Sequence, residues 1–521
     1  MPTQVQPRLS IFANEPFTDF AQPREEQAIR AAIGGARAAL GRSYESFFTA
    51  GKAALERVVS VNPANPGEVI GVHYGSPAEV DEAVRRAERA FSEWSRSELA
   101  TRTGLLRRTA AKLRESKHTF SAWLVLEAGK NWAEADADTA EAIDFLEFYA
   151  MQAERLAETS PAIQYPGEDD KLRYLPLGPG VVLPPWNFPL AILAGMTCAA
   201  IVAGNTVVLK PSPLAPTVGR LFVDLLTECG MPEGVVNLVQ GGTAVGAAMV
   251  AHPRVRFVAF TGSKRAGLEI HARAAQTPPE QHWIKRTILE LGGKDAIIVH
   301  RDADLEMAAE GVVASAFGFS GQKCSACSRL IVHEDVYEDM LGAVMEKTAK
   351  LAWGDPAENR AVTPVIDEVA YRRVLQYVAD APRQGRVIVG GKALTAPERG
   401  YYVAPTIVAD VDAGSPLAQE EIFGPVLAAI KARSFDEALR IANGTPYGLT
   451  GAVYSNSEEY LDRAAEEFHV GNLYLNRKCT GAMVGAHPFG GFNLSGTDSK
   501  AGGEDYLLHF TQAKSIARRV G

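Results

Sequence analysis

Residues 181–209 read VVLPPWNFPLAILAGMTCAAIVAGNTVVL and contain no charged side chain. An apolar run of this length could span a membrane. Three prolines interrupt its first third, however, and Asn187 and Asn205 would be costly in lipid. β-Branched residues gather at both ends of the run, at 181–183 and 206–209. We therefore predict a buried strand, a loop, a buried helix and a second buried strand, and no membrane span.

Two more apolar runs follow this stretch and are typical of strands in the same sheet. They are VVNLV at 235–239 and VRFVAF at 255–260. Helical patterns at 214–229, 243–251 and 264–276 alternate with them. Strands that alternate with helices imply crossover connections, so we predict an α/β fold with a doubly wound, Rossmann-like parallel sheet.

A second α/β lobe is predicted downstream. Apolar runs at 295–299 and 328–333 are typical of buried strands, and 335–352 carries a long helical pattern. Upstream, 76–128 and 134–156 are rich in Ala, Glu and Arg at helical spacing. We expect these upstream segments to form helices that cover the first sheet.

The composition is that of an ordinary globular protein. The chain has 521 residues, 46% hydrophobic and 22% charged, enough for two or three full-sized domains. Its net charge of −9 is spread without long basic or acidic blocks, so neither nucleic acid nor a membrane surface is an expected partner. Five cysteines at irregular spacing favour a reducing compartment. The N-terminus has no secretory pattern, so we expect the cytoplasm, with a mitochondrial matrix form left open.

A cysteine and a glutamate in separate glycine-bearing motifs indicate the reaction class. Cys324 lies in FGFSGQKCSACSR and Glu290 in ILELGGKD. A thiolate is a strong carbon nucleophile, and a carboxylate from another segment can activate the water that releases a thioester. Cys324 follows Gly321 at an expected loop-to-helix entry, where helix N–H groups would lower the pKa of the thiol. The pair suits oxidation of an aldehyde to an acid.

Each of these residues also has a plainer interpretation. A lone cysteine is more often buried and structural, and Glu290 on its own could be an exposed carboxylate at a strand end. Cys324 and Cys327 form a Cys-x-x-Cys, which could be a redox pair or half of a zinc site. The sequence has no second Cys or His pair at ligand spacing, so we expect no metal.

Seven short motifs occur in order along the chain. They are PWNFP (185–189), NTVVLKPS (205–212), FTGS (260–263), ELGGKD (290–295), GQKC (321–324), EEIFGP (420–425) and PFGG (488–491). With them, the chain from about Val58 to its end resembles the NAD(P)-dependent aldehyde dehydrogenase family. The segments 320–329 and 475–510 and an N-terminal NEPF are similar to one group of that family, the Δ1-pyrroline-5-carboxylate dehydrogenases. The resemblance implies oxidation of L-glutamate γ-semialdehyde to L-glutamate, the second step of proline catabolism.

The resemblance also implies three catalytic residues. Cys324 would be the nucleophile that forms a thiohemiacetal and then a thioester, and Glu290 would be the base for hydrolysis. Asn187 would hold the aldehyde oxygen together with the backbone N–H of Cys324. The presence of Glu290 argues against a coenzyme-A-acylating relative. The complete set argues against a non-catalytic nucleotide-binding or structural protein.

The expected cofactor is NAD. Residues 262–267 follow a predicted strand and open a helix, an arrangement that can hold a pyrophosphate. By resemblance, Lys210 bonds the adenosine ribose, Glu421 bonds the nicotinamide ribose, and Phe423 packs beside the nicotinamide. The other residues implied in cofactor binding are Pro185, Trp186, Ser212, Gly262, Ser263, Gly267 and Leu291. Many NAD-specific relatives carry a glutamate where this chain has Pro213, so NADP stays open, and NAD is favoured because no obvious arginine replaces the acid.

The substrate is expected to be recognised by its α-carboxylate and α-ammonium. Bare N–H groups in the loop 480–482 and the hydroxyl of Ser325 suit the carboxylate. By resemblance, the substrate-binding residues are Ser325, Gly481 and Ala482 at the carboxylate, Glu141 at the ammonium, and Phe188 and Phe489 along the aliphatic chain. The nearest alternative is a dehydrogenase for another carboxylated semialdehyde, such as succinate semialdehyde, which a single arginine anchor would favour.

Four regions are predicted from these features. Residues 1–50, which include the helical pattern AIRAAIGGARAALG, form an N-terminal helical extension on the surface; 51–156 and 179–289 form the Rossmann-like cofactor domain; 290–480 form the catalytic domain; and 157–178 with 495–521 form a small β oligomerisation flap. We expect a homodimer as the basic unit, with larger homo-oligomers left open. Any cooperation with a proline-oxidising enzyme would be a transient contact between separate chains.

Overall fold

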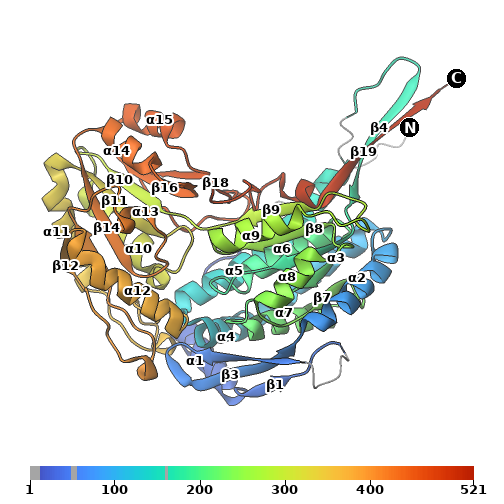
Figure 1. The fold of residues 1–521 in the computed structure, drawn as a ribbon, viewed down its shortest axis with the longest axis horizontal. Helices are drawn as coiled ribbons and strands as arrows, with labels where there is room; N and C mark the ends of the chain where they lie inside the picture. Colours follow the sequence, from blue (N-terminus) through green and yellow to red (C-terminus); the bar gives the residue numbers. More distant parts are fainter. Residues whose placement is uncertain (1–11, 49–54, 159–161, 521) are drawn as a thin grey trace.

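Two α/β lobes and a projecting two-stranded arm make up the molecule in the computed structural model (Figure 1). The structure describes residues 12–48, 55–158 and 162–520, and the parts of the predictions that fall on other residues lie outside it. In Figure 1 the blue and green elements of the first lobe lie beside the yellow and orange elements of the second.

The first lobe is built on a five-stranded parallel sheet with the order β7-β6-β5-β8-β9. Its strands are β5 (Pro179–Leu183), β6 (Thr206–Leu209), β7 (Val236–Leu238), β8 (Phe257–Thr261) and β9 (Arg286–Glu290). Helix α6 (Ala191–Val202) connects β5 to β6, and both of these strands are fully buried. The apolar stretch is therefore strand, loop, helix and strand, as predicted. Among the described residues, no helix is long and apolar enough to span a membrane.

Seven further helices pack around this sheet. They are α2 (Val80–Trp94), α3 (Leu99–Glu115), α4 (Lys117–Ala128), α5 (Trp132–Glu158), α7 (Pro216–Glu228), α8 (Thr243–Ala251) and α9 (Lys264–Ala274). The helical patterns predicted for these segments are confirmed. Helix α5 packs against α6, and Gly195 on α6 permits the approach because a Cβ there would lie 3.0 Å from the ring of Phe145.

The second lobe is built on a seven-stranded sheet with the order β12-β13-β14-β11-β10-β16-β17. Its strands are β10 (Asp295–Val299), β11 (Cys327–His333), β12 (Arg386–Val389), β13 (Thr406–Ala409), β14 (Val426–Ala432), β16 (Thr450–Tyr454) and β17 (Asn472–Leu475). Neighbouring strands are parallel except for the edge pair β12 and β13. Its helices are α10 (Leu305–Phe317), α11 (Tyr337–Ala349), α12 (Glu368–Asp380), α13 (Pro416–Gln419), α14 (Phe435–Asn443) and α15 (Glu458–Glu467). The strands and the helix predicted between residues 295 and 352 are confirmed.

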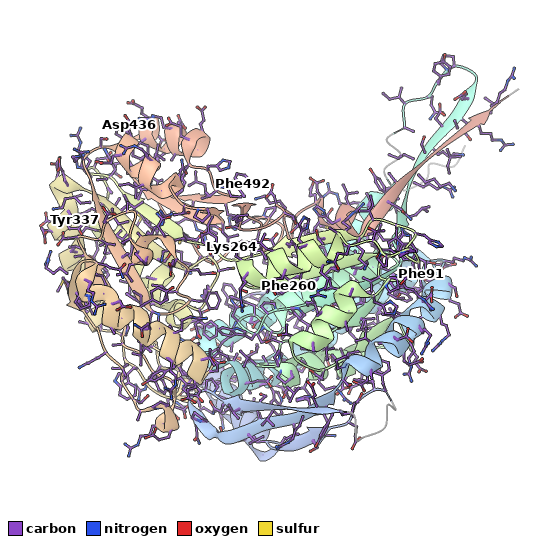
Figure 2. The ribbon with its side chains drawn as sticks, in the orientation of Figure 1. Phe91, Phe260, Lys264, Tyr337, Asp436 and Phe492 are labelled. Atoms are coloured by element: carbon purple, nitrogen blue, oxygen red, sulfur yellow. The ribbon has the colours of Figure 1, made fainter. Side chains whose placement is uncertain are left out.

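The two lobes touch through side chains next to the predicted cofactor motifs. Trp186, in the loop after β5, lies edge-on to Phe423 of the second lobe, with ring centres 5.5 Å apart. Lys264, at the start of α9, places Nζ 4.5 Å from the ring centre of Tyr447 in β15 (Tyr447–Gly448), and Figure 2 labels it at the edge of the first lobe. β15 pairs in turn with β18 (Phe492–Asn493).

The N-terminal region contains a helix and a small sheet. Helix α1 (Pro23–Ala38) agrees with the predicted helix. Strand β1 (Arg42–Tyr44) pairs with β3 (Asn65–Gly75), which also pairs with β2 (Glu56–Asn62). This sheet was not predicted: β1 has only three residues, too few to show a period of two, and β3 contains a proline and three glycines, which weaken the signal of a strand.

The projecting arm is a pair of antiparallel strands from distant parts of the chain. β4 (Glu168–Pro176) and β19 (Thr511–Arg519) pair along their whole length and extend away from both lobes (Figure 1). Residues 495–510, which we grouped with the flap, return to the first lobe, where Tyr506 and Phe510 are buried in its core. The C-terminal segment therefore contributes to the first lobe as well as to the arm.

Candidate active site

The loops at the carboxyl ends of β5, β6, β8 and β9 line a cleft of about 620 Å³ that also reaches residues of the second lobe. Open parallel sheets commonly bind ligands at this edge. Eleven of the residues predicted for catalysis or cofactor binding line the cleft: Pro185, Trp186, Asn187, Lys210, Ser212, Gly262, Ser263, Leu291, Cys324, Glu421 and Phe423. The fold thus brings side chains from most of the seven motifs to one place.

Cys324 lies in a turn between a short 3-10 helix (Gly318–Gly321) and strand β11. The predicted helix entry at Cys324 is therefore wrong, since the chain continues into a strand. Burial raises the pKa of the Cys324 thiol well above its usual value, and the nearby carboxylates of Asp295 and Glu421 raise it further. The thiol is thus protonated at rest and must lose its proton as it attacks.

The turn before the nucleophile has an unusual backbone. Phe319 and Ser320 have φ angles of 50° and 52°, in the left-handed region. Gly321 follows with φ 70°, and a Cβ on it would lie 2.4 Å from the carbonyl oxygen of Gly424. Only glycine fits this close approach, which brings the nucleophile's turn against the segment that carries Phe423, itself at φ 55°.

Asn187 is held in place beside Cys324 on the cleft wall. Its side chain is 5% exposed, and Nδ2 donates to the carbonyl oxygen of Gln322 at 3.0 Å. An amide nitrogen carries two hydrogens, so this bond orients the side chain and leaves a second donor for a ligand oxygen. The arrangement suits the stabilisation of an oxyanion formed at Cys324.

Replacing Asn187 with alanine should lower kcat for aldehyde oxidation by about 10²–10³, the typical cost of one lost oxyanion donor. KM for NAD should stay near the wild-type value, because the amide faces the reacting oxygen. Steady-state NADH formation measures both constants. Asn187→Asp is the matched control. Its carboxylate would repel the oxyanion, so its kcat should be at least as low as that of Asn187→Ala. A kcat unchanged in Asn187→Ala would contradict the assignment.

Glu290 ends strand β9 next to the C-terminal segment. Its Oε1 accepts a short hydrogen bond from the hydroxyl of Ser499, while its Oε2 is buried with no partner among the described residues. Burial raises the pKa of Glu290 to about 8. The carboxyl group does not line the cofactor cleft, yet its charge reaches Cys324 and contributes to the raised pKa of the thiol. A carboxyl group that influences the nucleophile from outside the cofactor cleft suits a base that acts on water.

Two helix N-termini point into the cofactor part of the cleft. α9 follows Gly262 and Ser263, and the Ser263 hydroxyl accepts from the backbone N–H of Ala266 at 3.3 Å. α8 begins at Thr243, after Gly242, and both of these residues line the cleft. Free N–H groups and the positive end of the helix dipole suit an anionic group. The second of these termini was missed, although the sequence GGT after an apolar strand is the signal that could have revealed it.

Two charged residues, Lys210 and Glu421, complete the cofactor side of the cleft, whereas Gly267 does not line it. Burial lowers the pKa of Lys210 to about 8, and its Nζ donates to the carbonyl oxygens of Pro211 and Gly241, both at 3.1 Å. Burial raises the pKa of Glu421 to about 7, and its Oε1 accepts from the N–H of Gly293 at 3.2 Å. Gly267, predicted to bind cofactor, is not on the cleft wall. A Cβ there would lie 2.2 Å from Leu291 Cδ2, so Gly267 lets α9 pack against that loop.

The loop predicted to anchor the carboxylate is joined to the turn of the nucleophile through Cys479. Cys479 donates from Sγ to the carbonyl oxygen of Ser325 at 3.4 Å, which joins the loop 480–482 to the residue after Cys324. Arg477 donates to the carbonyl oxygens of Thr480 and Gly481 at 3.2 and 3.1 Å. This arginine braces the backbone of the loop, an arrangement that differs from a single arginine anchor for a carboxylate.

The remaining predicted substrate residues lie on helix α5 and in two loops. Burial, followed by the charge of Asp138, raises the pKa of Glu141 to about 8. Lys130, fully buried, pairs with Asp138 at 2.9 Å and places Nζ 3.9 Å from the ring centre of Phe188. Phe489 is fixed through its backbone, whose N–H and carbonyl both pair with Ala501 at 2.8 Å. The Lys130–Asp138 pair was not predicted as part of the site.

The model of the aldehyde dehydrogenase family matches residues 48–516. The chain belongs to this family. Among curated relatives of this aldehyde dehydrogenase is the 1-pyrroline-5-carboxylate dehydrogenase of Geobacillus thermodenitrificans, 52% identical over 510 residues, which cover 97% of this chain and 99% of that protein.

Two solved structures of similar aldehyde dehydrogenase chains extend the comparison. The 1-pyrroline-5-carboxylate dehydrogenase from Thermus with bound NAD is 46% identical, with a TM-score of 0.95 over 98% of this chain and 100% of that chain. Proline utilization A (PutA) from Bdellovibrio bacteriovorus is 40% identical, with a TM-score of 0.94 over 98% of this chain and 53% of that chain. This chain is therefore similar in fold to a stand-alone dehydrogenase and to about half of a longer protein.

Proposed function

We propose that this aldehyde dehydrogenase oxidises L-glutamate γ-semialdehyde, which is in equilibrium with Δ1-pyrroline-5-carboxylate, to L-glutamate with NAD. The proposal rests on one arrangement: Cys324 and Asn187 line the cofactor cleft, and Ser325 links the nucleophile to the loop 480–482. The names of the relatives that are about half identical over nearly the whole chain support the same substrate.

The residues present fit NAD. Two helix N-termini and the ammonium of Lys210 line the cleft, and these positive groups suit the pyrophosphate and the adenosine ribose. Glu421 would hold the nicotinamide ribose, and Phe423 would pack beside the ring. NAD, when bound, accepts the hydride that leaves the substrate carbon. Pro213 also lines the cleft and offers no carboxylate against a 2′-phosphate, so NADP is the second cofactor to compare.

The chain's own residues would carry the chemistry on the carbonyl group. Cys324 Sγ bonds to the aldehyde carbon and releases its proton to water, while Asn187 Nδ2 and the Cys324 N–H hold the oxygen that becomes anionic. Loss of hydride from the carbon then leaves a thioester on Cys324. Glu290 takes a proton from a water molecule as that water attacks the thioester carbonyl. Glu290 then gives this proton to the departing Cys324 Sγ, so the products are the carboxylic acid and the free thiol.

We also propose that the arm formed by β4 and β19 joins two copies of the chain in a homodimer. Ile163 and Tyr165, next to β4, are 93% and 69% exposed, and large exposed apolar side chains favour association. The cytoplasm stays the proposed compartment, and transient contact with a proline-oxidising enzyme stays a proposal. The similarity to part of PutA supports that last point.

Purified protein should form NADH with L-glutamate γ-semialdehyde. kcat/KM should exceed the value for succinate semialdehyde by about tenfold or more, because both aldehydes carry a carboxylate but only L-glutamate γ-semialdehyde also carries an α-ammonium for Glu141. Absorbance of NADH, with NADP in a parallel series, measures both preferences. Equal or faster oxidation of succinate semialdehyde would keep the mechanism and reject the proposed substrate. No oxidation of any aldehyde would favour a non-catalytic nucleotide-binding protein.

A further inference from the structure

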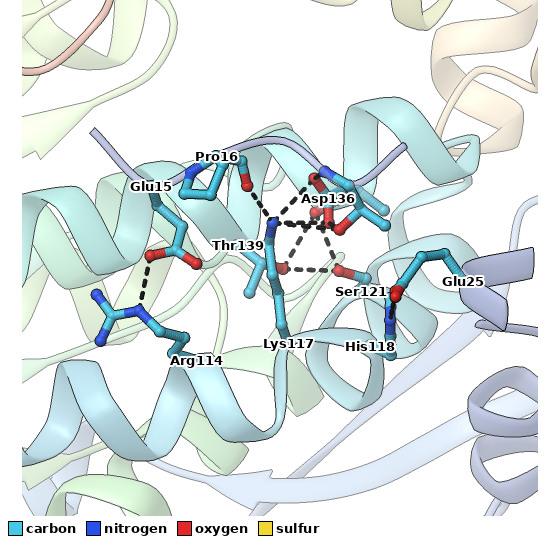
Figure 3. Close-up of polar contacts among 11 residues, drawn as sticks. Glu15, Pro16, Glu25, Arg114, Lys117, His118, Ser121, Asp136 and Thr139 are labelled. Atoms are coloured by element: carbon cyan, nitrogen blue, oxygen red, sulfur yellow. Dashed lines mark hydrogen bonds and ion pairs between the residues drawn. The ribbon is translucent and has the colours of Figure 1, made fainter. Parts of the chain in front are cut away.

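The N-terminal segment 12–20 lies before the part of the chain that the family model matches, yet it is tied closely to helices of the first lobe. Lys117 on α4 donates to the carbonyl oxygen of Pro16 at 2.8 Å and pairs with Asp136 on α5 at 3.0 Å. Glu15 pairs with Arg114 on α3 at 2.7 Å. Figure 3 shows these contacts, with the Lys117 side chain pointing up from its helix at the segment. The segment is thus an integral part of this lobe.

Asn14 in this segment reaches two separate parts of the proposed substrate site. Its Nδ2 donates to Asp144 Oδ2 at 2.8 Å and to the carbonyl oxygen of Val484 at 3.0 Å. Asp144 lies on α5 almost one helical turn after Glu141, and Val484 follows the anchor loop 480–482. One side chain therefore links the helix that carries Glu141 to the end of the loop that carries Gly481 and Ala482.

Neighbouring contacts hold the loop at the same point. The ring of Phe12 lies edge-on to Phe148 on α5, with centres 5.2 Å apart. Gly485 fits against both rings, since a Cβ on it would lie 3.1 Å from Phe148 and 3.3 Å from Phe12. The backbone N–H of Glu15 adds a bond to Asp144 Oδ1 at 2.6 Å. The loop is consequently clamped between the N-terminal segment and α5.

We propose that Asn14 is a positioning residue for substrate specificity in this dehydrogenase, an inference that rests on the proposed function. Asn14 fixes the distance between α5 and the loop 480–484, so that the N–H groups of Gly481 and Ala482 meet the α-carboxylate while Glu141 meets the α-ammonium. A preorganised pair of anchors avoids the cost of ordering the loop when substrate binds. Aldehydes without these two groups do not use the bridge.

Thr18 offers a matched control within the same segment. Its Oγ1 donates to Asp136 Oδ1 at 2.6 Å, so Thr18 also ties the segment to α5. The Thr18 hydroxyl contacts Asp136, about one and a half helical turns before Glu141, and Lys117, which lies on another helix. Thr18→Val therefore loosens the segment to a similar degree while it leaves the bridge to Val484 intact.

The test compares wild type, Asn14→Ala and Thr18→Val, each with L-glutamate γ-semialdehyde and with propanal, which lacks both the amino and the carboxylate group. In Asn14→Ala, KM for L-glutamate γ-semialdehyde should rise about tenfold, equivalent to about 1.4 kcal/mol. KM for NAD, and both kcat and KM for propanal, should stay near the wild-type values. Asn14→Ser, whose side chain is too short to reach both partners, repeats the measurement if the alanine variant folds poorly. Thr18→Val should leave every constant near wild type.

Each alternative outcome overturns the inference. An unchanged KM for L-glutamate γ-semialdehyde in both Asn14 variants would show that the loop holds its place without the bridge. A similar rise for propanal, or the same rise in Thr18→Val, would reduce Asn14 to a purely structural role. A wild-type enzyme that does not oxidise L-glutamate γ-semialdehyde would overturn the proposed function as well, and that failure is recognised in the wild-type series alone.

Discussion

Replacing Cys324 with alanine should abolish NADH formation from L-glutamate γ-semialdehyde, with a loss in kcat of at least ~10⁴. The variant has no atom that can add to the aldehyde carbon, so no thiohemiacetal forms and no hydride can leave. Asn187 and Glu290 keep their positions in this variant, but neither can supply the covalent bond. A continuous assay of NADH absorbance detects the loss. The rise in Tm on adding NAD should persist, because the cofactor side of the cleft is untouched.

Cys327→Ala is the matched control for the nucleophile. Cys327 is 1% exposed and donates from Sγ to the carbonyl oxygen of Arg329 at 3.5 Å, at the first residue of β11. Its loss should lower stability by about 1 kcal/mol through a small cavity and leave kcat within a few-fold of wild type. Turnover that survives without Cys324, or that is lost equally without Cys327, would contradict the nucleophile assignment and favour a redox pair.

Much of the fold could be predicted because it depends on local patterns. β5, β6, β8 and β10 are continuous runs of β-branched and other apolar residues, and such runs identify buried parallel strands. The prolines after β5 exclude a membrane helix for a reason that is equally local. Likewise, Gly262 and Ser263 before α9 indicate a helix N-terminus directly from the sequence.

The environment of Cys324 could not be predicted from its local sequence. Because Cys324 follows Gly321, we expected a helix to begin there, whereas Phe319 and Ser320 turn the chain with positive φ and the chain continues into β11. The pKa of the thiol then follows from burial and from Asp295, which belongs to a different strand. Such effects depend on tertiary packing.

Long-range hydrogen bonds could not be predicted from the sequence either. Ser499 bonds Glu290 across 209 positions, and Asn14 bonds Val484 across 470. The local sequence around a serine or an asparagine does not predict a hydrogen-bond partner so far away in the chain. The loop 480–482 and Glu290 could therefore be proposed from the sequence, while the residues that hold them in position were missed.

Replacing Glu290 with glutamine should lower kcat by about 10²–10⁴, because an amide cannot accept a proton from the attacking water. Hydride transfer precedes this step, so the variant should release a burst of about one NADH per active site and then stall as the thioester. The pH dependence of kcat gives a second test, because burial raises the pKa of Glu290 to about 8 in the wild type. Only the carboxylate form is a base, so kcat of the wild type should rise as the pH rises through about 8, and this limb should vanish in Glu290→Gln.

Ser499→Ala is the control that ties the pH limb to this carboxyl group. The hydroxyl of Ser499 lowers the pKa of Glu290, as do the Ser499 N–H and the charge of Lys500, whereas Asp498 and burial raise it. Removing the hydroxyl should shift the limb to higher pH, with kcat on the high-pH plateau close to wild type. If kcat of Glu290→Gln still rises with pH as in the wild type, the titrating group is not Glu290. A variant without a burst would place the defect before hydride transfer, and Glu290 would then act on the proton of Cys324 instead of on water.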